Sequence, residues 1–220
     1  MRTFDEILAI AAERKGSVEA VLGAVTPVAP QAEVAAVPDD RWLAEMKRAV
    51  FQAGFNWDVI EKKWPGFEAA FEGFDVGRCA FMPEDWFEEL AADTRIVRNG
   101  KKIRAVQVNA QLIQSVEGGF GAKIAGWPRE DFAGLLQWLG KGGSHMSGTS
   151  AQYMLRKMGV DGYVLGKDVV GRLIAEGVID KPPTSQKAMQ AVQGAFNEWA
   201  DQSERSLKEI SRVLAQSLDA

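Results

Sequence analysis

Apolar residues recur at intervals of three and four along most of the chain, whereas sustained alternation of apolar and polar residues is scarce. Because a helix repeats about every 3.6 residues and a strand every two, this pattern predicts an all-α protein. The expected helices cover about residues 4–16, 39–54, 56–64, 83–92, 101–114, 128–139, 149–158, 168–176, 185–201 and 206–218.

Proline, glycine and capping residues divide this pattern. The Ala/Pro-rich stretch 25–38 predicts an extended connector, so we expect an N-terminal helical extension over residues 1–38 and a main domain over residues 39–220. Asp39 and Asp40 are candidate caps of the helix that follows the connector, and Pro65 is expected to close the short helix after Asn56. Ser206 and Glu209 have the spacing of a capping box.

Composition narrows the function classes. The chain has 220 residues, is 46% hydrophobic and carries a formal net charge of −4, so it can bury a core, and any contact with a nucleic acid must be a local patch. One cysteine, Cys79, excludes an internal disulfide, and one histidine, His145, leaves too few ligands for a structural zinc site. We expect no metal, no cofactor, no membrane span and a cytoplasmic location.

A glycine-rich segment between two expected helices predicts a phosphate-binding hairpin. Glycines 140, 142, 143 and 148 are expected to allow positive φ, and Thr149 and Ser150 to cap the next helix. No acidic residue occurs from residue 132 to 160, although Lys141, Arg156 and Lys157 do. The candidate contacts to DNA phosphates are Lys141, Gly143, His145, Gly148, Thr149 and Ser150. The alternative is a tight turn without a ligand.

Three further segments, residues 51–63, 67–71 and 95–110, together with the hairpin, resemble the bacterial DNA-3-methyladenine glycosylase I family. The most specific piece is Gln-Ala-Gly-aromatic-x-Trp, which ends at Trp57. The resemblance covers roughly residues 39–159 and implies an all-α helix-hairpin-helix DNA glycosylase-like fold. It also implies removal of alkylated purines from double-stranded DNA in base excision repair.

The sequence departs from this family at two sites. The family has a zinc site built from cysteines and histidines near its termini, and this chain has no Cys or His where those ligands would fall. The family also has a base-recognising glutamate eight positions before the tryptophan, and here that position is Ala49. From these two departures we expect that the protein recognises the base differently from the family and binds no zinc.

The resemblance implies that Trp57 stacks on an extruded base, because a damaged base must leave the duplex before it is cut. Phe51, Phe55 and Asn56 flank Trp57, and Trp42 is a candidate to close the pocket from the preceding helix. Three of these residues have a structural alternative. The two tryptophans could be core residues, and Asn56 could only cap a helix.

In the wider helix-hairpin-helix glycosylase superfamily, a catalytic aspartate follows the last hairpin glycine by about one helix and a turn. Asp168 lies twenty residues after Gly148, at the start of an expected helix that favours an ionised carboxylate. An anion there would stabilise positive charge on the sugar. The alternative is that Asp168 is only an N-cap.

The chain is therefore expected to be a monofunctional DNA glycosylase. A lyase would need a Schiff-base lysine at the end of the hairpin, where this chain has Gly148, Thr149, Ser150 and Ala151. Two alternatives stay open: a DNA-binding relative without catalytic activity, which the change at Ala49 favours, and a helical protein-interaction scaffold, which the acidic net charge favours.

Overall fold

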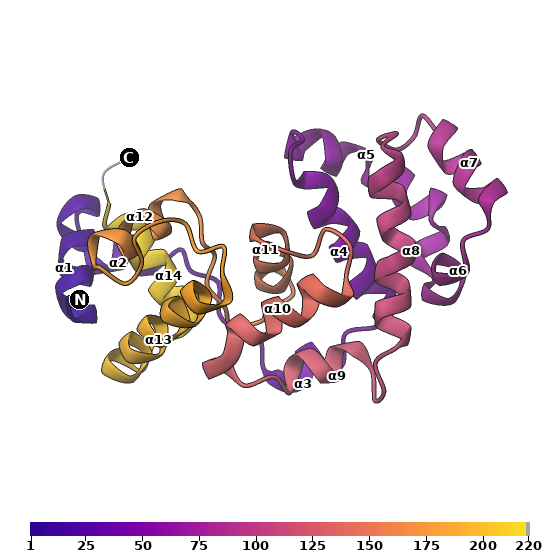
Figure 1. The fold of residues 1–220 in the computed structure, drawn as a ribbon. Helices are drawn as coiled ribbons and strands as arrows, with labels where there is room; N and C mark the ends of the chain where they lie inside the picture. The colour runs from indigo at the N-terminus through magenta and orange to yellow at the C-terminus, as the bar shows by residue number, and fades with distance from the viewer. Residues whose placement is uncertain (219–220) are drawn as a thin grey trace. The chain divides into compact units, whose positions relative to one another are not determined.

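The computed structural model describes residues 1–218, which form helices and no strand (Figure 1). The predicted all-α class is confirmed. The chain forms two compact units, and each combines segments that are distant in sequence. Unit 1 contains residues 1–29, 128–134 and those from 159 onward, and unit 2 contains residues 30–127 and 135–158. The predicted division after residue 38 stays a prediction.

Unit 1 is arranged around its last helix. Helix α14 packs against four other helices of the unit, and the bounds of these five elements are α1 (Phe4–Lys15), α2 (Val18–Leu22), α12 (Lys167–Ala175), α13 (Gln186–Ser203) and α14 (Leu207–Gln216) (Figure 1). The buried Tyr163 ring lies 4.9 Å from the Phe132 ring and 4.4 Å from the Phe196 ring, between centroids. These aromatic contacts join the 128–134 segment to the segment from residue 159 onward in one core.

The start of α14 is capped twice. Ser206 and Glu209 form the predicted capping box. In addition, the Asp161 carboxylate accepts hydrogen bonds from the backbone N–H groups of Leu207 (3.2 Å) and Lys208 (3.0 Å). Burial raises the pKa of Asp161 in spite of these bonds. The free N–H groups of this helix are thus satisfied by residues inside unit 1.

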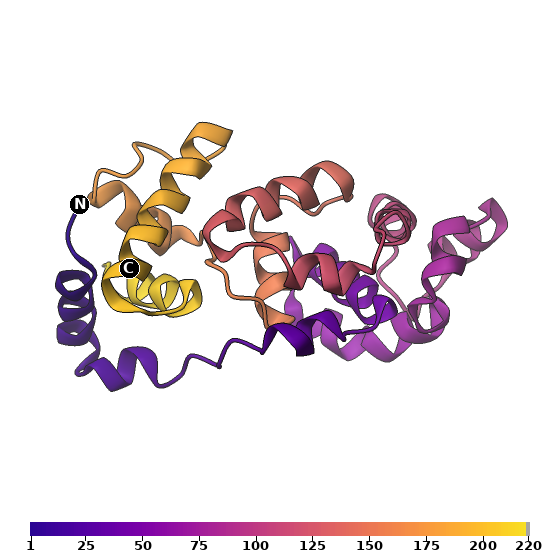
Figure 2. The same ribbon diagram turned by 90° about the horizontal axis from the view of Figure 1, so that it is seen from below.

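Unit 2 is built on two long helices, α4 and α8, which pack against each other. Figure 2 looks nearly along α8. Helices α6 and α7 pack on α8, and α11 packs on α4. The elements of this unit are α3 (Gln31–Ala35), α4 (Asp39–Gln52), α5 (Trp57–Ala70), the 3-10 turn η1 (Glu72–Phe74), α6 (Val76–Phe81), α7 (Glu84–Ala92), α8 (Gly100–Gln114), α9 (Phe120–Ala125) and α11 (Thr149–Lys157). After the 3-10 turn η2 (Arg129–Asp131) of unit 1, α10 (Phe132–Gly142) leads from unit 1 into unit 2.

The prediction that Pro65 ends a helix is wrong. Helix α5 continues through Pro65 to Ala70. The neighbouring Gly66 lies so close to the 93–95 segment that a Cβ there would meet the Arg95 carbonyl oxygen at 2.6 Å. Phe67, one residue further, is fully buried. Tertiary packing of the residues that follow Pro65 therefore outweighs the one backbone hydrogen bond that a proline cannot make.

Three other local expectations need correction. The connector over residues 25–38 is not extended throughout, because it contains α3. Asp39 and Asp40 lie in the first turn of α4, and its N-cap is Pro38, which makes no side-chain capping bond. Helices α6 and α9 were not predicted, since six residues are too few to display a helical period. The acidic first turn of α4 still complements the helix dipole.

Candidate functional site

Trp57 is exposed on the surface of unit 2. It is the first residue of α5 and 49% of its surface is accessible, so the alternative of a core tryptophan is wrong. The preceding Asn56 is the N-cap, and its side-chain oxygen accepts a hydrogen bond from the Asp58 N–H at 2.8 Å. The capping interpretation of Asn56 is thus confirmed. The cap fixes the first turn of α5 and with it the position of the Trp57 ring.

The Trp57 ring is paired with the Tyr153 ring. Their centroids are 5.6 Å apart with an interplanar angle of 86°, an edge-to-face contact. Tyr153, in the second turn of α11, is itself 42% exposed. The pair joins the N-terminus of α5 to the helix that follows the hairpin. Sequence reasoning missed Tyr153, although the buried pattern of α11 at Ala151, Met154 and Leu155 places it on the opposite face.

The other aromatic residues predicted to contact the base differ in their solvent exposure. Phe51 and Trp42 have no accessible surface, whereas Phe55 is 39% exposed. Trp42 packs edge-to-face on Phe120 at 5.5 Å, so its core interpretation is confirmed. Phe51 lies beneath Phe55, with ring centroids 6.5 Å apart. Phe51 therefore supports Phe55 from below, Trp42 packs in the core beside Phe120, and Phe55 is the residue of these three that a ligand can reach.

The hairpin occupies residues 143–148, which is shorter than predicted because Gly140 and Gly142 are helical. Of the four glycines, Gly148 alone has a positive φ, +59°. Gly142 and Gly143 serve close packing instead, since a Cβ would meet Leu112 at 2.7 Å and Met146 at 2.9 Å. The non-glycine residue with positive φ in this segment is His145, also at 59°, and its side chain is exposed.

A buried asparagine holds the hairpin on α8. The Asn109 amide donates to the Ser144 carbonyl oxygen at 3.2 Å, and the Ser144 N–H donates to Asn109 Oδ1 at 2.7 Å. Asn109 is 1% exposed and was missed by sequence reasoning, although a polar residue on the apolar face of the 101–114 helix was a usable signal. This two-bond clamp fixes the backbone immediately before the hairpin tip.

The N-terminus of α11 is open. Thr149 and Ser150 are the first helical residues and do not cap the helix; the N-cap is Gly148, and no side chain caps it. The first backbone N–H groups of α11 therefore lack a side-chain cap, which is the arrangement that binds anions. Lys141 is exposed near this end, whereas Lys157 forms an ion pair with Glu45 at 3.2 Å. This ion pair neutralises the charge of Lys157, so the segment around the hairpin is less basic than the sequence predicts.

Asp168 is the second residue of α12 and belongs to unit 1. The N-cap of α12 is Gly166, so the interpretation of Asp168 as an N-cap is wrong. The side chain is half-buried and makes no hydrogen bond or ion pair with any residue that the structure describes. The carboxylate lies in the first turn of α12 and is available to a ligand.

Part of the chain is similar to a known protein family. Residues 35–126 match the model of the methyladenine glycosylase family. The matched segment is similar to that family and covers less than half of the chain. Residues of the chain are also 36% identical, over 66 positions, to DNA-3-methyladenine glycosylase 1 of Escherichia coli (strain K12). That match spans 30% of the chain and only about a third (35%) of the relative.

The solved structures extend the likeness of the fold beyond the matched segment. An 8-oxoguanine glycosylase/lyase of Methanocaldococcus jannaschii, solved with DNA, has a TM-score of 0.55 at 14% identity and covers 95% of both chains. The 8-oxoguanine DNA glycosylase of Thermotoga maritima has a TM-score of 0.54 at 16% identity, over 96% of this chain and 95% of its own. A 3-methyladenine DNA glycosylase I has a TM-score of 0.48 at 25% identity, over 58% and 83%. The predicted helix-hairpin-helix DNA glycosylase-like fold is confirmed.

The methyladenine glycosylase match includes the position of the altered base-recognition residue. Ala49 is buried on α4, and the neighbouring Lys47 on the same helix is 1% exposed. Lys47 Nζ lies 3.9 Å from the Phe51 ring centroid and 4.3 Å from that of Phe71, and it donates to the Lys102 carbonyl oxygen at 3.2 Å. Burial lowers the pKa of Lys47 well below its usual value.

The zinc site that the resemblance associates with this family has no counterpart in the described part of the chain. No group of three or more His, Cys, Asp or Glu residues among residues 1–218 is placed to hold a metal ion. The lone Cys79 is buried, and burial raises the pKa of its thiol to about 12. Within the same range, no helix is both long and apolar enough to cross a membrane.

Proposed function

We propose that this protein is a monofunctional DNA glycosylase that hydrolyses the N-glycosidic bond of alkylated purines such as 3-methyladenine in DNA, the first step of base excision repair. The observation that carries the proposal is the exposed Trp57–Tyr153 pair beside the uncapped N-terminus of α11. One feature offers a platform for a flipped base and the other a site for a backbone phosphate.

Stacking explains how an alkylated purine is selected without a glutamate at position 49. A purine alkylated on a ring nitrogen is cationic, and a cation is attracted to the face of an indole ring. Trp57 therefore favours the damaged base over its neutral parent by charge as well as by area. An alkylated base is also a good leaving group, so positioning and electrostatic stabilisation supply much of the catalysis.

The chemical step in this proposal uses Asp168 and water. As the bond between the sugar C1′ and the purine nitrogen breaks, the bonding electron pair goes to the base, which neutralises its positive charge. The Asp168 carboxylate stabilises the resulting oxocarbenium-like sugar. Water adds to C1′ and releases its proton through Asp168 to solvent, which leaves an abasic site. No lysine lies at positions 148–151 to form a Schiff base, which supports hydrolysis without strand cleavage.

The test measures release of free base from a methylated DNA duplex under single-turnover conditions, together with duplex affinity. We expect wild-type protein to release 3-methyladenine and Asp168→Asn to lose release while it keeps its affinity. Asp180→Asn, which removes an exposed aspartate of the same unit, is the matched control and should be fully active.

The other outcomes distinguish the alternatives. Release that survives in Asp168→Asn would reject Asp168 as the catalytic residue. Duplex binding without any release by the wild type would support the DNA-binding relative, which the replacement of the family glutamate by Ala49 favours. Absence of both binding and release would support the protein-interaction scaffold. Release of 8-oxoguanine in preference to 3-methyladenine would reject the proposed substrate class.

A further inference from the structure

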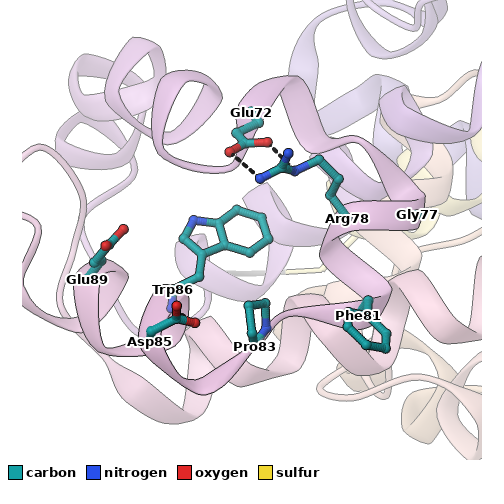
Figure 3. A pocket seen from close by; sticks show the side chains of 8 residues that line it. All are labelled: Glu72, Gly77, Arg78, Phe81, Pro83, Asp85, Trp86 and Glu89. Atoms are coloured by element: carbon teal, nitrogen blue, oxygen red, sulfur yellow. Dashed lines mark hydrogen bonds and ion pairs between the residues drawn. The ribbon is translucent and has the colours of Figure 1, made fainter.

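Unit 2 has a hollow of about 530 Å³ that the proposed glycosylase site does not use. It is lined by residues of η1, α6 and α7 and the turn between these two helices (Figure 3). The lining residues are Glu72, Gly77, Arg78, Phe81, Pro83, Asp85, Trp86 and Glu89. Its volume lies within the range of about 300–1,000 Å³ that is typical of ligand pockets.

The apolar part of this hollow is unusually accessible. Phe81, the last residue of α6, is 83% exposed, the highest value among the exposed large apolar residues. The Trp86 ring is half-buried and stands between the Glu72–Arg78 pair and Pro83 (Figure 3). Exposing a phenylalanine to this degree costs free energy in water, which contact with a partner would recover.

The charges around the hollow favour a cationic ligand. Its lining contains three carboxylates and one cation, and that cation, Arg78, is already paired with Glu72. Asp85 and Glu89 form no ion pair with any residue in the described range, and both are exposed. Two uncompensated carboxylates beside two aromatic rings complement a basic side chain with an apolar neighbour and repel DNA phosphates.

The hollow is also separated from the candidate DNA contacts within unit 2. Helices α6 and α7 pack on α8, whereas α11, which carries the hairpin end and Tyr153, packs on α4. Figure 1 shows α7 and α11 on opposite sides of α8. A ligand in the hollow therefore leaves Trp57, Tyr153 and the N-terminus of α11 free.

We propose that the hollow between α6 and α7 is a docking site for a partner protein, whose arginine or lysine enters beside Trp86 and pairs with Asp85 and Glu89. An apolar residue next to that basic side chain covers Phe81. This site is independent of the glycosylase chemistry, so it stands or falls separately from the proposed function.

The test uses the full chain labelled with ¹⁵N and three peptides, acetyl-Leu-Arg-Leu-amide, acetyl-Leu-Gln-Leu-amide and acetyl-Leu-Glu-Leu-amide. We expect the arginine peptide to shift the Trp86 indole and the Arg78 and Phe81 amide resonances in a saturable way. The glutamine peptide should bind at least about tenfold more weakly, because it lacks the charge that pairs with the carboxylates. The glutamate peptide should not bind.

Two double variants, each of which removes two carboxylates, test whether the peptide binds at the hollow. The double variant Asp85→Asn, Glu89→Gln should bind the arginine peptide at least about tenfold more weakly than the wild type. Glu33→Gln with Glu117→Gln, which removes two exposed carboxylates elsewhere in unit 2, should leave its affinity unchanged. Equal binding of the arginine and glutamine peptides, an equal effect of both double variants, no saturable shift, or displacement of the peptide by a short DNA duplex would each overturn the proposal.

Discussion

Lys47 is a lysine in an environment that suits an aromatic or aliphatic residue. It is surrounded by the rings of Phe51, Phe67 and Phe71, and its one hydrogen-bond acceptor is the carbonyl oxygen of Lys102. Aromatic faces attract a cation, but the loss of hydration outweighs this attraction, and the pKa of Lys47 falls. The residue therefore links the stability of unit 2 to pH.

Lys47→Met is expected to stabilise the protein near neutral pH by about 1–3 kcal/mol, because a buried ionisable group is replaced by an apolar one of similar length. In the unfolded chain Lys47 regains its ordinary pKa of about 10.4, so between the two pKa values the unfolded state binds the extra proton. Stability of the wild type is therefore lost as pH falls below about 10.4, and the advantage of the methionine variant should shrink as pH rises from about 7 to 10.

Urea unfolding followed by tryptophan fluorescence at several pH values measures this difference. Lys62→Met, which removes an exposed lysine of the same unit, is the control and should give a difference that does not change over this range. A constant advantage of Lys47→Met at every pH would contradict the role assigned to its ionisation.

Tyr153 is expected to position the Trp57 ring rather than to react. An edge-to-face aromatic pair contributes about 0.5–1.5 kcal/mol, so Tyr153→Ala should slow single-turnover base release by about three- to tenfold. Tyr153→Phe keeps the ring and should retain the wild-type rate. If the phenylalanine variant were as slow as the alanine variant, the hydroxyl rather than the ring contact would be the important group.

At the scale of elements, the hairpin depends on one glycine. Gly148 combines φ +59° with ψ −142°, a conformation that is essentially restricted to glycine. Gly148→Ala should therefore cost about 1–3 kcal/mol locally and weaken duplex binding, because the N–H groups at the start of α11 would be displaced. Hydrogen exchange of α11 and duplex titration would measure both effects.

Gly140→Ala is the matched control for this substitution. Gly140 lies inside α10, and an added Cβ there would make only ordinary contacts, the nearest at 3.6 Å. Alanine favours a helix over glycine by about 1 kcal/mol, so this variant should be stabilised or unchanged and should bind DNA normally. Equal loss of DNA binding in both variants would mean that the hairpin responds to any added side chain.

The helices were predictable where the periodicity is long, as in α8, or where a capping box accompanies it, as in α14 with Ser206 and Glu209. Prediction was wrong where tertiary contacts decide, as at Pro65, whose helix is held by packing around Gly66 and Phe67. The candidate site shows the same limit. The resemblance singled out Trp57, but its exposure and its contact with Tyr153, which is 96 positions away, depend on how α5 and α11 pack.

At the scale of the whole molecule, unit 1 needs the N-terminal segment. The Phe4 N–H donates to the Gln202 side chain at 2.8 Å, the Trp199 indole donates to the Arg2 carbonyl oxygen at 3.1 Å, and Arg2 pairs with the buried Glu176 carboxylate at 2.8 Å. The first two helices therefore complete a core whose other residues lie about 170–200 positions later in the chain.

Deletion of residues 1–29 is thus expected to unfold unit 1 and to leave unit 2 folded. It would expose the faces of α13 and α14 that α1 and α2 cover, and it removes no residue of unit 2. Hydrogen exchange read by mass spectrometry should show lost protection in α13 and α14 and kept protection in α4 and α8. Loss of protection in all four helices would show that the two units unfold as one.

The segmented construction of unit 1 also imposes an order of events during synthesis. Helices α1 and α2 are translated before α14, against which both pack and which follows about 185 residues later. All residues of unit 2 are translated before α12, α13 and α14. We therefore expect α1 and α2 to remain unfolded while unit 2 folds. They should become stably folded only after α14 has been synthesised.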